Sequence, residues 1–357
     1  MKHILLLLIL SLLLTGCIKA EDYTVIEPKD PLPKGERLFG ITISESKNGF
    51  MSSFETAREA GIEMVEINLP WNYFETERGK YEDPEGYLDS LRFYTANGIQ
   101  ITLSFALINT VAWEVPSYLE GVDPDAPQFI RAFEKVIDWI FSRTLPEVDI
   151  AAVSVGNEID LVLEGEDQWR SYTDFYEAAA GYIRSRYPGI RVGVKTTVTG
   201  GLFGEERDEI QTINRFSDVV MLNYYPQGEK CRVKPPTSVY GDFAGMVSAF
   251  PGREIWLTEV GYQSGGIYCN SSEKKQAEFY HHLFSAWDRN SETIIAVQIN
   301  WLHDQSPQTI DEWKEYYGSD PALVEFLATL GLKYYDGTDK PAWLQIKREA
   351  RARGWGR

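Results

Sequence analysis

The stretch DIAAVSVGNEI, residues 149–159, begins as a buried β-strand and ends in polar residues. Val153 to Gly156 are apolar or small, as in a strand that is covered on both faces. Asn157 and Glu158 then place an amide and a carboxylate where such a strand would otherwise carry Val or Ile. A carboxylate is almost never fully buried without a partner. We therefore expect the strand to end here and both side chains to face a polar site.

Similar β-rich runs recur along the chain, with helical patterns between them. The other runs are 37–44, 64–71, 100–108, 190–197, 217–226, 254–262 and 294–304. The helical patterns cover 53–60, 87–97, 129–141, 171–186, 205–215, 240–249, 274–289 and 320–330. Eight strand–helix units in series predict one α/β domain, a (β/α)8 TIM barrel. A doubly wound sheet is the alternative, but the first run is not followed by the glycine-rich phosphate loop typical of that fold.

The net charge and the aromatic content indicate which kinds of molecule the protein binds. The 357 residues carry a formal net charge of −18, which argues against nucleic acid or anionic lipid as the main partner. The 10 Trp and 20 Tyr exceed what a core needs, and such rings suit stacking on flat apolar faces of ligands, including sugar rings. The basic tail 347–357 is expected to be a solvated helix end.

The N-terminus has the layout of a targeting segment. Lys2 and His3 precede an apolar run that is too short to span a membrane and ends at Thr15-Gly16-Cys17. This layout resembles a bacterial lipoprotein signal peptide, which implies that Cys17 is lipidated. The resemblance implies an exported protein that only a lipid anchor holds at a bacterial outer membrane or cell surface. We expect a signal over 1–17, a tether over 18–36 and the barrel domain over 37–357; an ordinary secretory signal is the alternative.

Two further cysteines, Cys231 and Cys269, lie in the loops after the sixth and seventh strands. In an exported protein this even number favours a disulfide, which would join the two loops. These two cysteines alone cannot make a four-ligand zinc site, and the whole chain has only four His. We therefore expect neither a metal nor another cofactor.

In a barrel of this kind, catalytic side chains come from the C-terminal ends of the strands. Glu158 ends the fourth strand and Glu259 ends the seventh, on nearly opposite sides of the barrel. A pair of carboxyl groups suits cleavage of a glycosidic bond, because one protonates the departing oxygen and the other meets the sugar carbon. Other polar and aromatic residues at strand ends are Asn68, Trp71, Asn157, Asn223, Tyr225 and Trp301.

The Asn-Glu pair that ends the fourth strand and the Glu that ends the seventh resemble those of the clan A glycoside hydrolases, which are retaining (β/α)8 enzymes. The resemblance covers most of residues 37–304. It implies that Glu158 is the general acid/base and Glu259 the nucleophile. It further implies that Asn157 binds a sugar hydroxyl, Tyr225 donates its hydroxyl to Glu259, and Trp301 forms the floor under the sugar. Tyr225 is preferred over its neighbour because it shares strand parity with the polar residue two positions earlier.

Within this clan, VGNEI and NYYP (223–226) are most similar to the arabinogalactan endo-β-1,4-galactanases. The segment 70–83 instead resembles clan A β-galactosidases and xylosidases. The implied substrate is a polysaccharide or its oligosaccharides, with Asn68, Trp71 and Asn223 as further substrate contacts. The alternatives are a non-catalytic carbohydrate-binding lipoprotein on the same barrel and a transglycosylase that uses the same two glutamates.

Overall fold

The structure is a computed structural model that describes residues 23–356. The predicted signal peptide, its Cys17 and residues 18–22 of the predicted tether lie outside the described residues.

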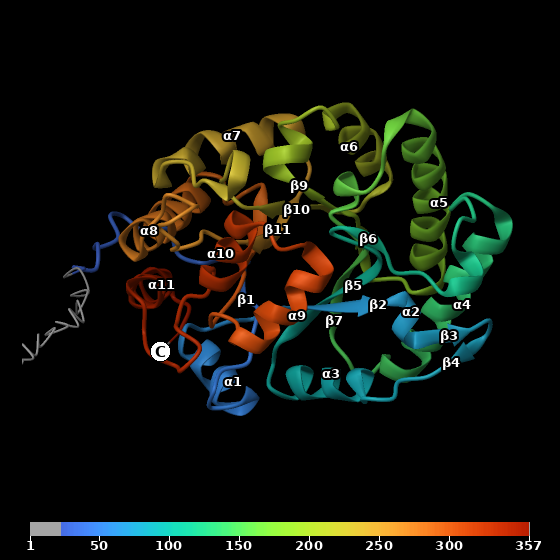
Figure 1. Cartoon of the computed structure of the whole chain (residues 1–357), viewed down its shortest axis with the longest axis horizontal. Coiled ribbons are helices and arrows are strands. Elements are labelled where there is room, and N and C mark those ends of the chain that lie inside the picture. The colour runs from blue at the N-terminus through green and yellow to red at the C-terminus, as the bar shows by residue number, and fades with distance from the viewer. Residues whose placement is uncertain (1–22, 357) are drawn as a thin grey trace, which may run out of the picture.

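A ring of parallel strands forms the centre of the molecule (Figure 1). Hydrogen bonds connect the strands in the order β8-β7-β5-β2-β1-β12-β11-β10-β9. The fifth predicted strand is interrupted at Val194, so that its first half pairs with β7 and its second half with β10. Because the two halves are consecutive in the chain, they nearly close the ring, and the predicted (β/α)8 barrel is confirmed. The strands are β1 (Leu38–Ile41), β2 (Met64–Pro70), β5 (Gln100–Asn109), β7 (Ile150–Asn157), β8 (Arg191–Gly193), β9 (Lys195–Thr197), β10 (Val220–Tyr224), β11 (Ile255–Val260) and β12 (Ile294–Ile299).

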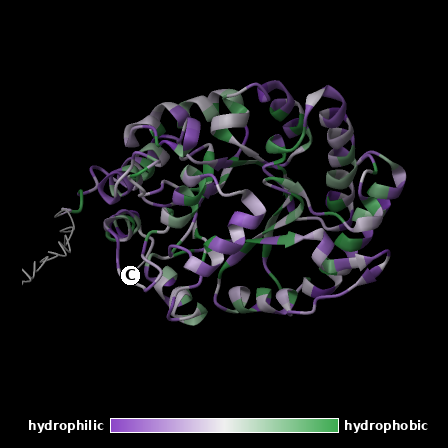
Figure 2. Cartoon of the chain, viewed as in Figure 1, coloured by the Kyte–Doolittle hydropathy of each residue, from purple (hydrophilic) through white to green (hydrophobic). Residues whose placement is uncertain are grey.

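Helices surround the ring, and all eight predicted helices are present with shifted ends. All but the last of them pack an apolar face on the outside of the strands, and Figure 2 shows hydrophobic strands surrounded by helices of mixed hydropathy. They are α1 (Phe50–Glu59), α3 (Tyr87–Ala96), α4 (Pro127–Thr144), α5 (Gly165–Arg186), α6 (Arg207–Ile213), α7 (Val239–Ala249), α8 (Glu273–Arg289) and α10 (Pro321–Thr329).

Further elements lie in the connections. Helices α9 (Pro307–Tyr317) and α10 both follow β12, and α11 (Pro341–Arg353) then packs beside α8 in the outer ring. The rest are α2 (Trp71–Phe74), β3 (Glu75–Glu77), β4 (Lys80–Tyr81), β6 (Ala112–Trp113), η1 (Ser117–Leu119), η2 (Ile159–Leu161), η3 (Val198–Leu202), η4 (Asn214–Phe216), η5 (Glu229–Cys231) and η6 (Pro236–Ser238).

The barrel interior changes from apolar to polar along the strands. At the N-terminal end, a layer that includes Met64, Met221 and Trp256 fills the barrel. Side chains two positions apart on a strand share a face, so on β2 the residues above Met64 are Glu66 and Asn68. Both line a cavity at the C-terminal end. The barrel interior therefore ends in a polar cavity at the C-terminal ends of the strands, where the sequence predicts the site.

The described part of the predicted tether lies against the domain. The side-chain amide of Gln345 on α11 pairs with the backbone of Ile26, and its carbonyl oxygen also accepts from the hydroxyl of Tyr23 at 2.7 Å. Further along, the Leu32 N–H donates to Asp288 on α8 at 3.2 Å. The described part of the predicted tether thus contacts both α8 and α11. Within the described residues, no helix is long and apolar enough to cross a membrane.

Candidate functional site

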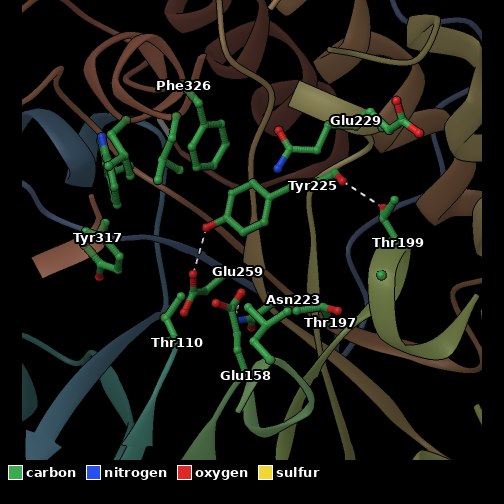
Figure 3. Close-up of a pocket in the computed structure, with 17 residues that line it drawn as sticks. Thr110, Glu158, Thr197, Thr199, Asn223, Tyr225, Glu229, Glu259, Tyr317 and Phe326 are labelled. Carbon is green, nitrogen blue, oxygen red and sulfur yellow. Dashed lines mark hydrogen bonds between the residues drawn. The ribbon is translucent and has the colours of Figure 1, made fainter. Parts of the chain in front are cut away.

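A cavity of about 510 Å³ opens at the C-terminal ends of the strands (Figure 3). We call it the main cavity. Strand ends on several sides of the barrel contribute Glu158, Asn223, Tyr225, Glu259 and Trp301 to its lining. Glu158 and Glu259 lie next to each other on its floor (Figure 3).

A second space of about 290 Å³ adjoins the main cavity and shares Glu259 and Trp301 with it. Side-chain amides dominate its lining, so we call it the amide chamber; they are Asn68, Asn109, Asn157, Asn300 and Gln305. Amides offer both donors and acceptors, which suits a ligand that carries many hydroxyl groups. The main cavity is more apolar on one side, where Leu323, Phe326 and Leu327 of α10 form a wall.

The end of β7 directs Glu158 into the main cavity. Gly156 has φ 92°, and a Cβ there would lie 2.4 Å from the hydroxyl oxygen of Tyr172, so only glycine fits. Glu158 itself has φ 52° and ψ 47°, a left-handed conformation that is uncommon for a residue with a side chain. The chain therefore leaves the strand in a sharp turn at the carboxylate.

The environment of Glu158 favours its protonated form. The side chain is buried, and its Oε1 accepts one hydrogen bond, from Nδ2 of Asn223 at 3.1 Å. Burial, followed by the charge of Glu259, raises the pKa of Glu158 to about 7. Near neutral pH this carboxyl can therefore donate a proton.

The environment of Glu259 favours its ionised form, because donors hold both of its oxygens. Oε2 accepts from the hydroxyl of Tyr225 at 2.7 Å and from Nδ2 of Asn300 at 2.9 Å. Oε1 accepts from Nζ of Lys195 at 2.9 Å. Hydrogen bonds and a cation both stabilise a carboxylate. The predicted hydrogen bond from Tyr225 to Glu259 is present.

Two asparagines connect the strand ends. Asn223 donates from Nδ2 to Oδ1 of Asn157 at 3.1 Å, in addition to its bond with Glu158, and its own Oδ1 accepts from Thr258 at 2.9 Å. Asn157 donates to Oδ1 of Asn109 at 3.0 Å, at the edge of the amide chamber. The structure therefore brings both asparagines to the site, where they also orient their neighbours.

The predicted aromatic residues divide between the site and the core. Trp301 lines both the main cavity and the amide chamber, and its ring lies 5.2 Å from that of Trp313 on α9. Trp71 is 3% exposed, packs against Phe129, and donates from Nε1 to Glu75 at 2.9 Å. Because β2 ends before it and α2 begins at it, Trp71 turns into the core. The prediction that Trp71 contacts substrate is therefore corrected.

The predicted disulfide is not formed in the structure, where Cys231 and Cys269 are free cysteines. The thiol of Cys269 instead donates to the carbonyl of Ala322 at 3.5 Å. Burial raises the pKa of Cys231 to about 11 and that of Cys269 to about 12. The loops are joined by hydrogen bonds, including one from the Val233 N–H to the Cys269 carbonyl at 3.0 Å.

Sequence reasoning missed two ionisable residues beneath the site, Glu66 on β2 and Lys195 on β9. Nζ of Lys195 contacts both Glu66 and Glu259. The sequence carried a signal for both, because Glu66 is the one charged residue of 64–71 and Lys195 directly follows the apolar stretch Val192-Gly193-Val194 within 190–197. Another missed residue, Asp160, accepts from the N–H of Thr197 at 2.9 Å and so connects the turn after β7 to the fifth strand.

No group of three or more His, Cys, Asp or Glu residues within 23–356 is arranged to hold a metal ion. The described acidic residues of the site are instead held by amides, hydroxyls and a lysine.

The sequence matches no protein-family model and no curated protein. Many solved structures nevertheless share its fold. A variant of the GH5_18 glycoside hydrolase from Streptomyces cattleya, in complex with Manβ1-4GlcNAc, gives a TM-score of 0.68 at 15% identity, covering 88% of this chain and 80% of the other. A family 39 glycoside hydrolase from Bacteroides cellulosilyticus WH2 gives 0.62 at 16% identity, covering 91% and 65%.

The GH53 catalytic domain from Ignisphaera aggregans gives a TM-score of 0.62 at 15% identity, covering 92% of this chain and 99% of the other. All three neighbours are clan A glycoside hydrolases. Identity this low establishes a shared fold rather than a shared activity. The chain therefore has the (β/α)8 barrel fold that these glycoside hydrolases have.

Proposed function

We propose that this protein is a retaining β-glycoside hydrolase. The observation that carries the proposal is that Glu158 and Glu259 share one cavity in opposite environments. The former is buried with one donor and its pKa is raised, while the latter has donors on both oxygens. A proton donor beside an ionised nucleophile is the arrangement that double displacement at a sugar requires. The glycoside hydrolase folds among the structural neighbours support the same reaction class.

In the first step, a carboxylate oxygen of Glu259 attacks the anomeric carbon while Glu158 transfers its proton to the leaving oxygen. The glycosidic bond breaks and a glycosyl ester forms on Glu259. In the second step, the Glu158 carboxylate takes a proton from water, whose oxygen attacks the same carbon. The ester breaks, Glu259 is restored, and the sugar leaves with its β configuration retained.

The two spaces suggest where each part of the substrate binds. The leaving group must lie near its proton donor, and Glu158 lines the main cavity but not the amide chamber. We therefore place the attacked sugar over Trp301 in the amide chamber, where Asn157 can contact the hydroxyl beside the reacting carbon. The leaving group lies against the apolar wall of the main cavity.

For the sugar itself, endo-β-1,4-galactan hydrolysis is one specificity to test, because a GH53 catalytic domain is among the neighbours. A β-mannoside is the second, since one neighbour was solved with Manβ1-4GlcNAc and another is an exo-β-1,4-mannosidase from Opitutaceae bacterium strain TAV5. A hydrolysis screen on β-galactan, β-mannan, β-glucan and xylan, with product lengths recorded, separates these specificities. It also separates hydrolysis from transglycosylation, which would give products longer than the substrate.

Two variants test the reaction. Replacing Glu259 with Ala should abolish turnover on any substrate that the wild type accepts, whereas Glu158→Ala with added azide should produce a β-glycosyl azide. Glu254→Ala is the matched control, because this glutamate lies just before β11, at the opposite end from Glu259, and pairs with Arg191. Wild-type turnover by Glu259→Ala would rule out the proposal. Glycan binding without turnover by the wild type would favour the non-catalytic binding protein.

Export and lipid anchoring through Cys17 are also part of the proposal. Expressed in a bacterium with its full N-terminus, the protein should partition into the membrane fraction and incorporate labelled palmitate. A Cys17→Ser variant should do neither. Labelling of that variant would show that another residue carries the lipid.

A further inference from the structure

A buried lysine lies beneath the proposed nucleophile. Lys195 is 0% exposed, and its Nζ contacts Oε1 of Glu259 at 2.9 Å and Oε1 of Glu66. The three residues come from β9, β11 and β2, so the contacts cross the interior of the barrel. An isolated ammonium group at this depth would be costly, and the two carboxyl groups offset that cost.

Glu66 is the less satisfied of the two partners. Its side chain is 6% exposed, and its Oε2 has no hydrogen-bond partner among residues 23–356. Burial raises the pKa of Glu66 to about 7, although Lys195 lowers it, and the charge of Glu259 raises it further. By contrast, the charges of Glu259 and Glu66 outweigh burial and raise the pKa of Lys195. Lys195 is therefore a fixed cation, while Glu66 can gain or lose a proton near neutrality.

Other titratable groups face Glu259 from the elements around it. Glu158 lies at the end of β7, Tyr225 follows β10, and Tyr317 belongs to α9. Burial and the two glutamates raise the pKa of Tyr225 and that of Tyr317, so both phenols stay neutral at physiological pH. Lys195 is thus the cation in contact with Glu259 among the described residues, and Glu66 shares it.

We propose that Lys195 and Glu66 are positioning residues for the nucleophile: Lys195 holds Glu259 ionised and fixes its Oε1, and Glu66 sets how much of that cation Glu259 receives. The inference rests on the proposed function. When Glu66 is protonated, the charge of Lys195 acts on Glu259 alone. When Glu66 is ionised, it competes for Lys195 and adds a second negative charge near the nucleophile. The pair therefore adjusts the site without touching the substrate.

The test compares Lys195→Met with Glu66→Gln, because the proposal assigns them different effects on the pH profile. The acid limb of the profile of kcat/KM against pH reports the loss of the ionised nucleophile. Lys195→Met removes the stabilising cation and should move this limb to higher pH by about 1–3 units, with kcat/KM at least ten-fold lower at pH 6. Over this limb the wild-type Glu66, whose pKa is raised to about 7, is already protonated, so Glu66→Gln should leave the limb in place. A merely structural role for Lys195 would leave the limb in place in Lys195→Met as well.

A second readout follows the nucleophile directly. A 2-deoxy-2-fluoro β-glycoside should trap the glycosyl ester on Glu259, and mass spectrometry should find it forming more slowly in Lys195→Met than in the wild type. Glu63→Gln is the matched control, since this glutamate lies just before β2 at the opposite end of the barrel and pairs with Lys34. It should leave the limb and the trapping rate unchanged.

If Lys195→Met fails to fold, Lys195→Met combined with Glu66→Gln removes the unpaired buried carboxyl group and should show the same upward shift of the acid limb. With an active wild type, a folded and active variant of either kind whose acid limb stays at the wild-type pH overturns this inference alone. A wild type that hydrolyses no glycoside in the screen overturns the proposed function and this inference together.

Discussion

Two carboxyl groups of the same kind can differ in charge because their immediate neighbours differ. Glu158 has a single amide donor, from Asn223, whereas Glu259 has three donors and one of them is a cation. Burial removes the hydration that stabilises an ionised carboxyl group, and a single donor replaces little of it, so Glu158 keeps its proton more readily. The roles in the proposed mechanism follow from these contacts rather than from the residue type.

This difference predicts the basic limb of the pH profile. The pKa of Glu158 is raised to about 7, above the 4.5 of an ordinary glutamate, so the proton it must donate is present below pH 7 and lost above it. kcat/KM should therefore fall about ten-fold for each pH unit well above 7. In Glu158→Gln, hydrolysis of glycosides with ordinary leaving groups should drop by about 10²–10⁴-fold. A dinitrophenyl β-glycoside, whose leaving group needs no proton, should still form the glycosyl-enzyme in this variant, without a basic limb.

The control for this assignment is Glu66, whose pKa is also raised to about 7. If the basic limb persists in Glu158→Gln with the dinitrophenyl substrate but disappears in Glu66→Gln, Glu158 is not the group that titrates. Both profiles should be measured over pH 5–9 under the same ionic strength.

The sequence was sufficient to predict the site residues that lie at the ends of strands. Glu158, Asn223, Tyr225 and Glu259 were all named from their position after apolar runs, and all line the main cavity. Lys195 was missed because it lies inside a strand, where its partners come from two distant segments that only the closed barrel brings together.

At the scale of the element, periodicity gave the order of strands and helices, but not the identity of the last outer helix. The pattern at 320–330 is indeed helical, yet α10 lies over the site and α11 packs in the ring beside α8. A local pattern shows which face of a helix is apolar and cannot show whether that face meets the barrel wall or a cavity. For the same reason, the tail from 347 was predicted to be solvated although Arg353 is 3% exposed.

The position of α10 predicts a role in binding the leaving group. Phe326 lines the main cavity, and its ring packs edge-on against Tyr225 at 5.4 Å. Replacing Phe326 with Ala removes apolar surface that would cover the leaving group, so KM for an aryl β-glycoside should rise about ten-fold. Steady-state kinetics measures this, with Leu344→Ala on the exposed side of α11 as the control. A fall in kcat with KM unchanged would contradict a binding role and show that Phe326 acts by holding Tyr225.

Across the whole molecule, the N-terminal end of the barrel is closed by segments from both ends of the described chain. The guanidinium of Arg37 lies 4.8 Å from the ring centre of Trp287 and 5.3 Å from that of Trp355. Arg37 and Arg353 both bond to Asp288 on α8. Charged groups at this depth are paired, as buried charges must be. The end opposite the site is thus held by contacts between residues far apart in the sequence.

This arrangement predicts that Trp355, two residues from the C-terminus of the chain, is important for stability and not for catalysis. Trp355 is 1% exposed, stacks on Trp287 at 5.0 Å, and donates from Nε1 to Glu63 at 3.0 Å. Trp355→Ala would leave a cavity beneath the barrel and a glutamate without its donor. It should lower the free energy of unfolding by about 3–5 kcal/mol, measured by urea denaturation. Trp113→Ala, at a tryptophan that is 38% exposed, should lower the free energy of unfolding by about 1 kcal/mol or less.

Because the site lies at the other end of the barrel, kcat/KM of folded Trp355→Ala should equal that of the wild type. A loss of activity without a loss of stability would show that the two ends are coupled.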